Sequence, residues 1–404
     1  MKTNLLQVFE HQNLRIGDRL NDVIFETKHL KALECMAGSN GSPYFSLIHN
    51  GIKFNNYVGV ISIGNLVIEI LPKADKQSRD FNLWQGVLIQ MLMESGYLKV
   101  KSLSEASLSL RANHILDLYI ELFVQEIEFL LHSGLAKNYR LIQGNVNALK
   151  GPILFSKHLQ QNLVHQERFY VRFQVYDTIH VIHQILSKAI DLLPSITHDS
   201  PLLDRIKRIQ LTFPEVPSID VSESLFEKIR FNRRTERYKE ALQIAKLLLL
   251  NYHPDLSKGS NSVLAILFDM NDLWEKFVFN RIRRVAELES VHGQAKKLFW
   301  KSKTIRPDIL VKKKSGEVLV LDTKWKIVED RTPSDEDLKQ IFVYNHYFNS
   351  KRGILLYPSV LDEGVFPGQY HDLESTCEIA FVKIFDKDSR KLSKGIGGQI
   401  VRFL

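Results

Sequence analysis

The feature that most constrains the fold is an alternation of apolar and polar residues between residues 44 and 71. Side chains of a β-strand point to opposite faces in turn, so this alternation predicts strands with a buried face. The runs break at Asn50 and Gly64, residue types that accept the positive φ angles of tight hairpin turns, and Pro72 ends the last run. We therefore expect a small β domain over residues 1–75.

The apolar pattern then changes to a period of about 3.6 residues, which is typical of amphipathic helices. Few turn residues interrupt it. The pattern predicts helices over residues 83–92, 115–131, 175–193 and 238–250. We therefore expect a helical middle region over residues 76–255.

Residues 251–261 are rich in Pro, Gly, Ser and Asn, a composition typical of a linker or a long loop. Helical and strand patterns are mixed beyond this segment, so a third domain is expected over residues 256–404. The chain is thus predicted to be an α+β protein with several domains.

Composition bears on the compartment and the partner. The 404 residues include 54 Lys and Arg against 46 Asp and Glu, but only two cysteines. The positive charge favours a polyanionic partner, although many basic proteins never bind nucleic acid. Two cysteines cannot build a disulfide framework or a cysteine zinc site, and no apolar run is long enough to span a bilayer. A cytoplasmic protein that binds no membrane is expected.

Two acidic residues and a lysine flank a predicted hairpin in the third domain. Its two apolar runs are separated by a turn at Gly316, with Asp308 at the start of the first and Asp322 at the end of the second. Antiparallel pairing brings these carboxylates together, and strand alternation places Lys324 on the same face as Asp322. Such a site suits Mg²⁺ and the activation of water against a phosphodiester. A solvated ion pair at a hairpin end is the alternative.

The elements around the hairpin favour the metal site. Upstream, residues 267–284 predict an amphipathic helix with Glu275 in its early turns. Downstream, a capping-box pattern opens a second helix, and Gln340 and Tyr344 lie four residues apart on one face of it. Residues 353–357 predict another apolar strand. This order of elements is more specific than the acidic pair and lysine alone.

The order resembles the PD-(D/E)xK nuclease superfamily, with Pro307-Asp308 and Asp322-Thr323-Lys324 as its signature. Several segments are further similar to the McrC family, the nuclease subunits of McrBC restriction systems. These segments are Leu149–Leu159, Arg168–Val171, Asp177–Leu186, Leu321–Lys326, Gln340–Tyr344 and Gly353–Pro358. The resemblance covers residues 145–360 well. It implies a C-terminal α/β nuclease domain with a mixed central sheet.

The resemblance also implies roles for individual residues. Asp308 and Asp322 would ligate Mg²⁺, and Lys324 would position water or stabilise charge on the phosphate. Glu275 matches the accessory metal ligand of the superfamily, but a solvated helix glutamate fits its position equally well. Gln340 would orient the site or contact DNA. Asp322 stands where many relatives have Glu, and its shorter side chain remains a competent ligand.

No phosphate-binding loop of the type Gly-x-x-x-x-Gly-Lys-Ser/Thr occurs in the chain, so no nucleotide is expected to bind it. In the resembled family, a separate AAA+ GTPase hexamer, McrB, binds GTP and reads modified cytosine in double-stranded DNA. The nuclease subunit docks on that ring and stimulates hydrolysis. The first two domains of this chain would then be its docking half.

Other candidates and alternatives remain open at this stage. His180 and His183 have a metal-compatible spacing but are interpreted as structural, because no carboxylates lie near them in sequence. The basic runs 230–237 and 312–314 could contact phosphates or remain solvated surface. The rival functions are a non-cleaving adaptor that activates a GTPase ring and a stand-alone RecB-like repair nuclease.

Overall fold

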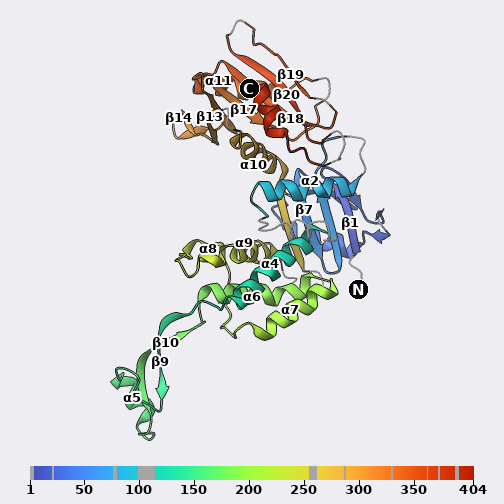
Figure 1. Cartoon of the computed structure of the whole chain (residues 1–404). Helices are drawn as coiled ribbons and strands as arrows, with labels where there is room; N and C mark the ends of the chain where they lie inside the picture. Colours follow the sequence, from blue (N-terminus) through green and yellow to red (C-terminus); the bar gives the residue numbers. More distant parts are fainter. Residues whose placement is uncertain are drawn as a thin grey trace. The chain divides into compact units, whose positions relative to one another are not determined.

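The computed structural model describes residues 4–20, 22–75, 80–98, 114–253, 262–285, 288–328, 331–361, 363–371, 374–386 and 391–404. The chain forms two compact units. Unit 1 comprises residues 1–3 and 116–253, and unit 2 comprises residues 4–115 and 254–404. Both helices and several β-sheets are present (Figure 1), as the α+β expectation requires. Most of the predicted linker, residues 254–261, lies outside the described residues.

The predicted N-terminal hairpins are present in unit 2. Asn50 and Gly64 have φ angles of 54° and 56° at the turns, and the last strand ends just before Pro72. The strands of this region are β1 (Asn4–Phe9), β2 (Asn13–Arg15), β3 (Arg19–Leu20), β4 (Val23–Ile24), β5 (Phe45–Ile48), β6 (Gly51–Phe54), β7 (Tyr57–Ile63) and β8 (Leu66–Leu71). Helix α1 (Thr27–Ala37) packs among them, and its Leu30 and Leu33 belong to their apolar core.

Strand β12 (Val263–Asp269) belongs to this N-terminal sheet, although the three-part division places it in the C-terminal domain. It pairs antiparallel with β7, and the order within unit 2 is β1-β8-β7-β12. The two backbones come so close that a Cβ on Gly59, whose φ is 136°, would lie 2.2 Å from the carbonyl oxygen of Ile266. A side chain at this position would push the strands apart.

Helix α2 (Phe81–Glu94), assigned by its period to the middle region, is also part of unit 2. It contacts β8 and helix α10 (Met270–Arg283). Glu94 Oε2 lies 2.6 Å from Arg281 Nε, and both side chains are largely buried. Helix α10 begins directly after β12 and is capped by Asp269, whose side chain accepts from the backbone of Asn271. The N-terminal sheet and the C-terminal elements are therefore parts of one unit.

The C-terminal part of unit 2 is a mixed six-stranded sheet with the order β13-β16-β17-β18-β20-β19. Its strands are β13 (Leu288–Gly293), β16 (Ile309–Lys313), β17 (Val318–Thr323), β18 (Arg352–Ser359), β19 (Gly364–Phe366) and β20 (Thr376–Lys383). Helix α11 (Asp335–Phe348) connects the parallel strands β17 and β18 and packs on them. Helix α12 (Ile396–Phe403) packs on β20 and α10. A separate hairpin is formed by β14 (Lys297–Trp300) and β15 (Lys303–Ile305).

Unit 1 contains most of the predicted helices. They are α4 (Ile115–His132), α6 (Val181–Ile196), α7 (Ser200–Thr212), α8 (Glu223–Lys228) and α9 (Lys239–Leu250), with a 3-10 turn at Glu236–Tyr238 and the short strand β11 (Tyr252–His253). The His180 ring caps α6, and buried His183 bonds to the Thr178 carbonyl and the Tyr238 hydroxyl. Both histidines are structural, as predicted. No helix in the described part of the chain is long and apolar enough to cross a membrane.

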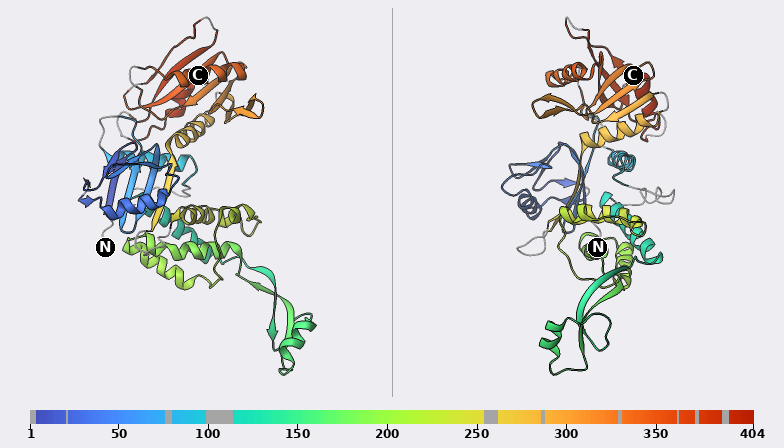
Figure 2. Two further views of the ribbon diagram at one scale, coloured as in Figure 1. Left: turned by 180° about the vertical axis from the view of Figure 1, so that it is seen from behind. Right: turned by 90° about the vertical axis from the view of Figure 1, so that its left-hand side faces the viewer.

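The expectation of a helical middle region over residues 76–255 does not hold for one segment. Strands β9 (Asn138–Val146) and β10 (Phe169–Asp177) pair antiparallel along their whole length, so the predicted helix 175–193 begins only at Val181. Helix α5 (Phe155–Asn162) lies between them in sequence and packs on β10. We call residues 138–177 the arm. Figures 1 and 2 show it extending away from helices α6 and α7 of the same unit.

A buried carboxylate links the two parts of unit 2. Glu10 follows β1, and its Oε1 accepts from the backbone of Lys73 at 2.9 Å and from Trp325 Nε1 at 2.7 Å. Trp325 follows β17 of the C-terminal sheet and packs on Trp274 of α10 at 5.3 Å between ring centroids. Burial raises the pKa of Glu10 to about 7.

Glu10→Gln is expected to stabilise the protein much more at pH 8 than at pH 5. The folded pKa exceeds that of the unfolded chain, so protonation stabilises the fold fully below the unfolded pKa, and this contribution is lost as the pH rises through about 7. Glutamine keeps an Oε1 for both hydrogen bonds and carries no charge. Thermal melting of both proteins at the two pH values measures the difference. An equal difference at both values would contradict a titrating Glu10.

Candidate active site

The predicted hairpin of the third domain is present. Strands β16 and β17 pair antiparallel in a register that joins Ile309 to Leu321. Gly316 at the turn has a φ of 85°. The register, continued by one residue, sets Asp308 opposite Asp322, as the sequence predicts.

Asp308 is held by the residue that follows Asp322. Its Oδ2 accepts from the backbone nitrogen of Thr323 at 2.7 Å and from the Thr323 hydroxyl at 2.9 Å. Burial raises the pKa of Asp308 in spite of these bonds and of the nearby charges of Lys324 and Arg306. Its other oxygen takes no part in this clamp.

Asp322 is nearly inaccessible, with 1% of its surface exposed. Its Oδ2 lies 2.8 Å from Lys324 Nζ, whereas its Oδ1 has no hydrogen-bond partner among the described residues. Burial, and then the charge of Asp308, raise the pKa of Asp322. A buried carboxylate oxygen without a partner is costly, so this group is suited to a ligand that carries positive charge.

Lys324 lies between acidic and amide groups. Its Nζ donates to Gln340 Oε1 at 3.0 Å and lies 3.6 Å from Asp337 Oδ1. Burial alone lowers its pKa, but the carboxylates of Asp322 and Asp337 raise it, and the net shift is upward. Lys324 is therefore a fixed ammonium rather than a proton acceptor.

Gln340 and Tyr344 are joined as their helical spacing predicts. Gln340 Nε2 donates to the Tyr344 hydroxyl at 2.8 Å, and that hydroxyl donates to the Arg306 carbonyl at 3.1 Å. Tyr344 also packs in the apolar core under α11. The chain of hydrogen bonds fixes the side of Gln340 that faces Lys324 and ties α11 to the segment before Asp308.

Glu275 of α10 lies near this site and is largely buried. Burial, and then the charge of Asp308, raise its pKa to about 7, while a hydrogen bond from the Gln294 side chain opposes the shift. The alternative of a solvated helix glutamate is therefore wrong. Glu275 is thus a buried carboxylate within electrostatic reach of Asp308.

Sequence reasoning missed Asp337 and Lys326. The sequence pattern explains Asp337 only as part of the helix cap, and its backbone nitrogen does donate to the Ser334 hydroxyl at 3.3 Å. Its side chain also pairs with Lys326 at 2.5 Å and faces Lys324. Because the position of Asp337 three residues after the cap already explains the start of the helix, the sequence gives no reason to expect its contacts with Lys324 and Lys326.

The residues fit a hard divalent cation. Among the described residues, no three His, Cys, Asp or Glu side chains form a ready-made cage. Mg²⁺, however, keeps several waters and commonly uses one or two carboxylates. The unpartnered Oδ1 of Asp322, together with the neighbouring Asp308, offers such a ligand set. Glu275 is close enough to Asp308 for the charge of Asp308 to raise the pKa of Glu275.

The two basic runs are weaker candidates for contacts with phosphates. Lys312 and Lys313 pair with Glu289 and Glu317, each at 2.8 Å. In the basic run of unit 1, Arg237 donates to the Ser133 carbonyl at 3.2 Å. Neither run forms part of the site built around Asp322.

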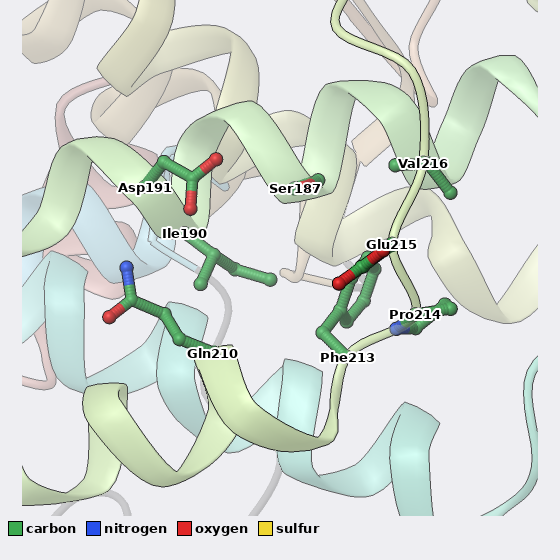
Figure 3. A pocket seen from close by; sticks show the side chains of 8 residues that line it. All are labelled: Ser187, Ile190, Asp191, Gln210, Phe213, Pro214, Glu215 and Val216. Carbon is green, nitrogen blue, oxygen red and sulfur yellow. The ribbon is translucent and has the colours of Figure 1, made fainter.

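A cavity of about 400 Å³ opens elsewhere, in unit 1 (Figure 3). Its lining residues are Ser187, Ile190, Asp191, Gln210, Phe213, Pro214, Glu215 and Val216. The cavity combines two carboxylates with apolar side chains and contains none of the predicted site residues. It has no nucleophile with an adjacent base, so we assign it no chemistry.

The model of the McrBC 5-methylcytosine restriction system component family matches residues 52–358. This match covers well over half of the chain. The chain belongs to the McrBC family. The McrC resemblance deduced from the sequence motifs is thereby confirmed.

Individual relatives of this McrBC family chain are distant. A protein of Escherichia coli (strain K12), described as Type IV methyl-directed restriction enzyme EcoKMcrBC, is 22% identical over 296 residues, which cover 66% of this chain and 82% of that protein. A chain in a half-complex of Thermococcus gammatolerans McrB AAA+ hexamers with bound McrC has a TM-score of 0.75 at 19% identity, covering 99% of this chain and all of that one. A second structure of the McrBC complex from that organism has a TM-score of 0.53. The fold is therefore shared along nearly the whole chain.

Proposed function

We propose that this chain is the Mg²⁺-dependent DNA endonuclease subunit of a GTP-dependent, modification-dependent restriction system. The observation that carries the proposal is the pairing of Asp308 with the buried Asp322, whose Oδ1 lacks a partner, beside the ammonium of Lys324. Two carboxylates and a lysine at the end of one hairpin are the predicted PD-(D/E)xK arrangement. Membership of the McrBC family agrees with it.

Asp308 and Asp322 would hold the metal, with Glu275 as a further acidic group. When bound, Mg²⁺ supplies Lewis-acid stabilisation of charge on the scissile phosphate. The Thr323 clamp fixes the orientation of Asp308. Lys324, held by Asp322 and Gln340, presents a positive charge that stabilises the phosphate oxygens as negative charge develops. Asp337 keeps Lys324 and Lys326 on one side of the site.

The partner in this proposal is an AAA+ GTPase hexamer of the McrB type. The chain itself has no phosphate-binding loop, and the T. gammatolerans relative is described as bound to McrB AAA+ hexamers. By the same reasoning, the DNA substrate carries modified cytosine, since the E. coli relative is described as methyl-directed.

We further propose that the arm of unit 1 is the docking element. Helix α5 turns its apolar side outward: Phe155 and Leu159 are four residues apart, and both are exposed. Its inner side is polar, because Asn162 exchanges two hydrogen bonds with Asn145 of β9 at 2.6 and 2.8 Å. A surface helix normally buries its apolar side, so this reversal suits a protein partner.

The test is reconstitution with an AAA+ GTPase of the McrB type on methylated and unmethylated DNA. Cleavage of methylated DNA is expected only with both proteins, GTP and Mg²⁺, and EDTA is expected to abolish it. GTP with the chain alone should show no turnover. Stimulated GTP turnover without cleavage under any metal condition would instead support a non-cleaving adaptor.

A further inference from the structure

The β14–β15 hairpin carries an exposed apolar and basic surface near the site. We call residues 296–305 the wing. All four residues of β14 are exposed, and Trp300 keeps 57% of its surface accessible. Lys301 Nζ lies 4.7 Å from the Trp300 ring, so a positive charge and an aromatic face lie side by side. A large indole ring left open to water marks a binding surface more often than a folding element.

The charge on the wing has one sign. Residues 293–307 include Lys296, Lys297, Lys301, Lys303 and Arg306 but no acidic residue. Within the described part of the chain, no carboxylate forms an ion pair with the lysines of the wing, whereas Lys312 and Lys313 on the next hairpin are both paired. Lysines without acidic partners around an aromatic ring favour a polyanion over a protein surface.

The wing is fixed with respect to the candidate active site. Phe299 packs edge-on against Tyr347 of α11 at 5.4 Å between ring centroids, and Lys297 donates to the Tyr347 carbonyl. Helix α11 also carries Gln340, which bonds to Lys324. At its other end, β15 is followed within three residues by Asp308. The wing is thus attached to helix α11, which carries Gln340, and to the segment that leads to Asp308.

We propose that the wing binds the DNA strand next to the scissile phosphate. Lys296, Lys301 and Lys303 contact phosphates, and Trp300 stacks on a base. Phe299 and Lys297 anchor the wing on α11. The proposal rests on the proposed nuclease function and adds to it the surface that positions the substrate. Because stacking uses the ring face of any base, this contact is independent of the DNA sequence.

Tryptophan fluorescence provides a direct test. The chain has four tryptophans, and Trp84, Trp274 and Trp325 are buried, so acrylamide quenching reports mainly on Trp300. Adding DNA to the full chain in EDTA, where no cleavage occurs, is expected to quench emission and to protect the remaining emission from acrylamide. Trp300→Phe is expected to remove the acrylamide-sensitive component and the response to DNA. A DNA response that persists in Trp300→Phe would overturn stacking at this residue.

Affinity measured in the same buffer gives the second readout. Trp300→Ala is expected to weaken DNA binding about 10-fold or more. Lys301→Ala combined with Lys303→Ala is expected to lower the slope of log affinity against log salt by about 1 to 2, since each phosphate contact contributes about 0.9. Matched controls are Leu361→Ala and Lys351→Ala, both exposed positions of the same unit. Neither control should change affinity or slope.

The outcomes separate the wing from the nuclease function. If Asp322→Asn abolishes cleavage but the wing variants bind DNA like the unaltered chain, the wing proposal is wrong and the proposed function stands. If the wing variants lose DNA affinity while the complex never cleaves DNA, the wing proposal stands and the proposed nuclease function is wrong. Wing variants that bind DNA normally but lose the AAA+ partner would identify a protein interface and overturn the proposal. No detectable DNA binding by the unaltered chain would also overturn it.

Discussion

Asp322→Asn is expected to lower the DNA cleavage rate of the reconstituted complex by about 10²- to 10³-fold or more. Asparagine has nearly the same shape as aspartate, but it lacks the charge that a metal ligand needs. Only 1% of Asp322 is exposed, and its Oδ1 has no partner among the described residues, so water cannot replace the lost ligand easily. Asp308→Ala and Lys324→Ala are expected to reduce cleavage in the same way. Nicking of methylated plasmid DNA with GTP and Mg²⁺ measures all three.

The folded state should survive the change at Asp322. Burial raises the pKa of its carboxyl, so its ionised form destabilises the fold and a neutral side chain does not. Lys324 keeps the Gln340 amide and the Asp337 carboxylate as partners. Asp335→Asn, an exposed position in the first turn of α11, is the matched control and should cleave normally. Near-normal cleavage by Asp308, Asp322 and Lys324 variants together would refute the site assignment.

The site could be predicted because its parts are local in the chain. One hairpin carries Asp308, Asp322 and Lys324. The sequence predicts both its turn at Gly316 and its antiparallel pairing. Gln340 and Tyr344 follow from helical spacing. The second role of Asp337 was hidden, because a residue that explains a helix start gives no reason to expect a further contact with Lys324.

The domain division was harder to predict because it depends on long-range pairing. Strand β12 pairs with β7 across about 200 residues, as in the pair Ala265 and Ile61. Nothing local distinguishes such a strand from one that belongs to the following domain.

The strands of the arm were not predicted for another reason. Strand β9 alternates between exposed and half-buried residues and buries none fully, so it carries only a weak apolar signal.

The position of β12 also decides how the docking function should be tested. A fragment that ends near Asn251 would lack β12, and the N-terminal sheet of unit 2 would lose a strand that pairs along all seven of its residues. Such a fragment would fail by misfolding, whatever its role in docking. Single substitutions in the full chain avoid this problem.

Leu159→Asp is expected to abolish stimulation of the partner's GTP turnover, whereas Asp322→Asn is expected to leave stimulation unchanged. Leu159 is 60% exposed on the outward side of α5, so a charge there costs little in the free chain but disfavours burial against a partner. Leu211→Asp is the control, because Leu211 is 87% exposed on α7 of the same unit.

GTP turnover of the partner is measured for the partner alone and with each full-length variant, after melting curves show that all variants are folded. The carboxylates of the candidate site belong to unit 2 and the arm to unit 1. Asp322→Asn should therefore lose cleavage alone, whereas Leu159→Asp should lose stimulation together with the cleavage that depends on the partner. If Asp322→Asn loses stimulation as well, or Leu159→Asp retains it, this division of functions between the units is wrong.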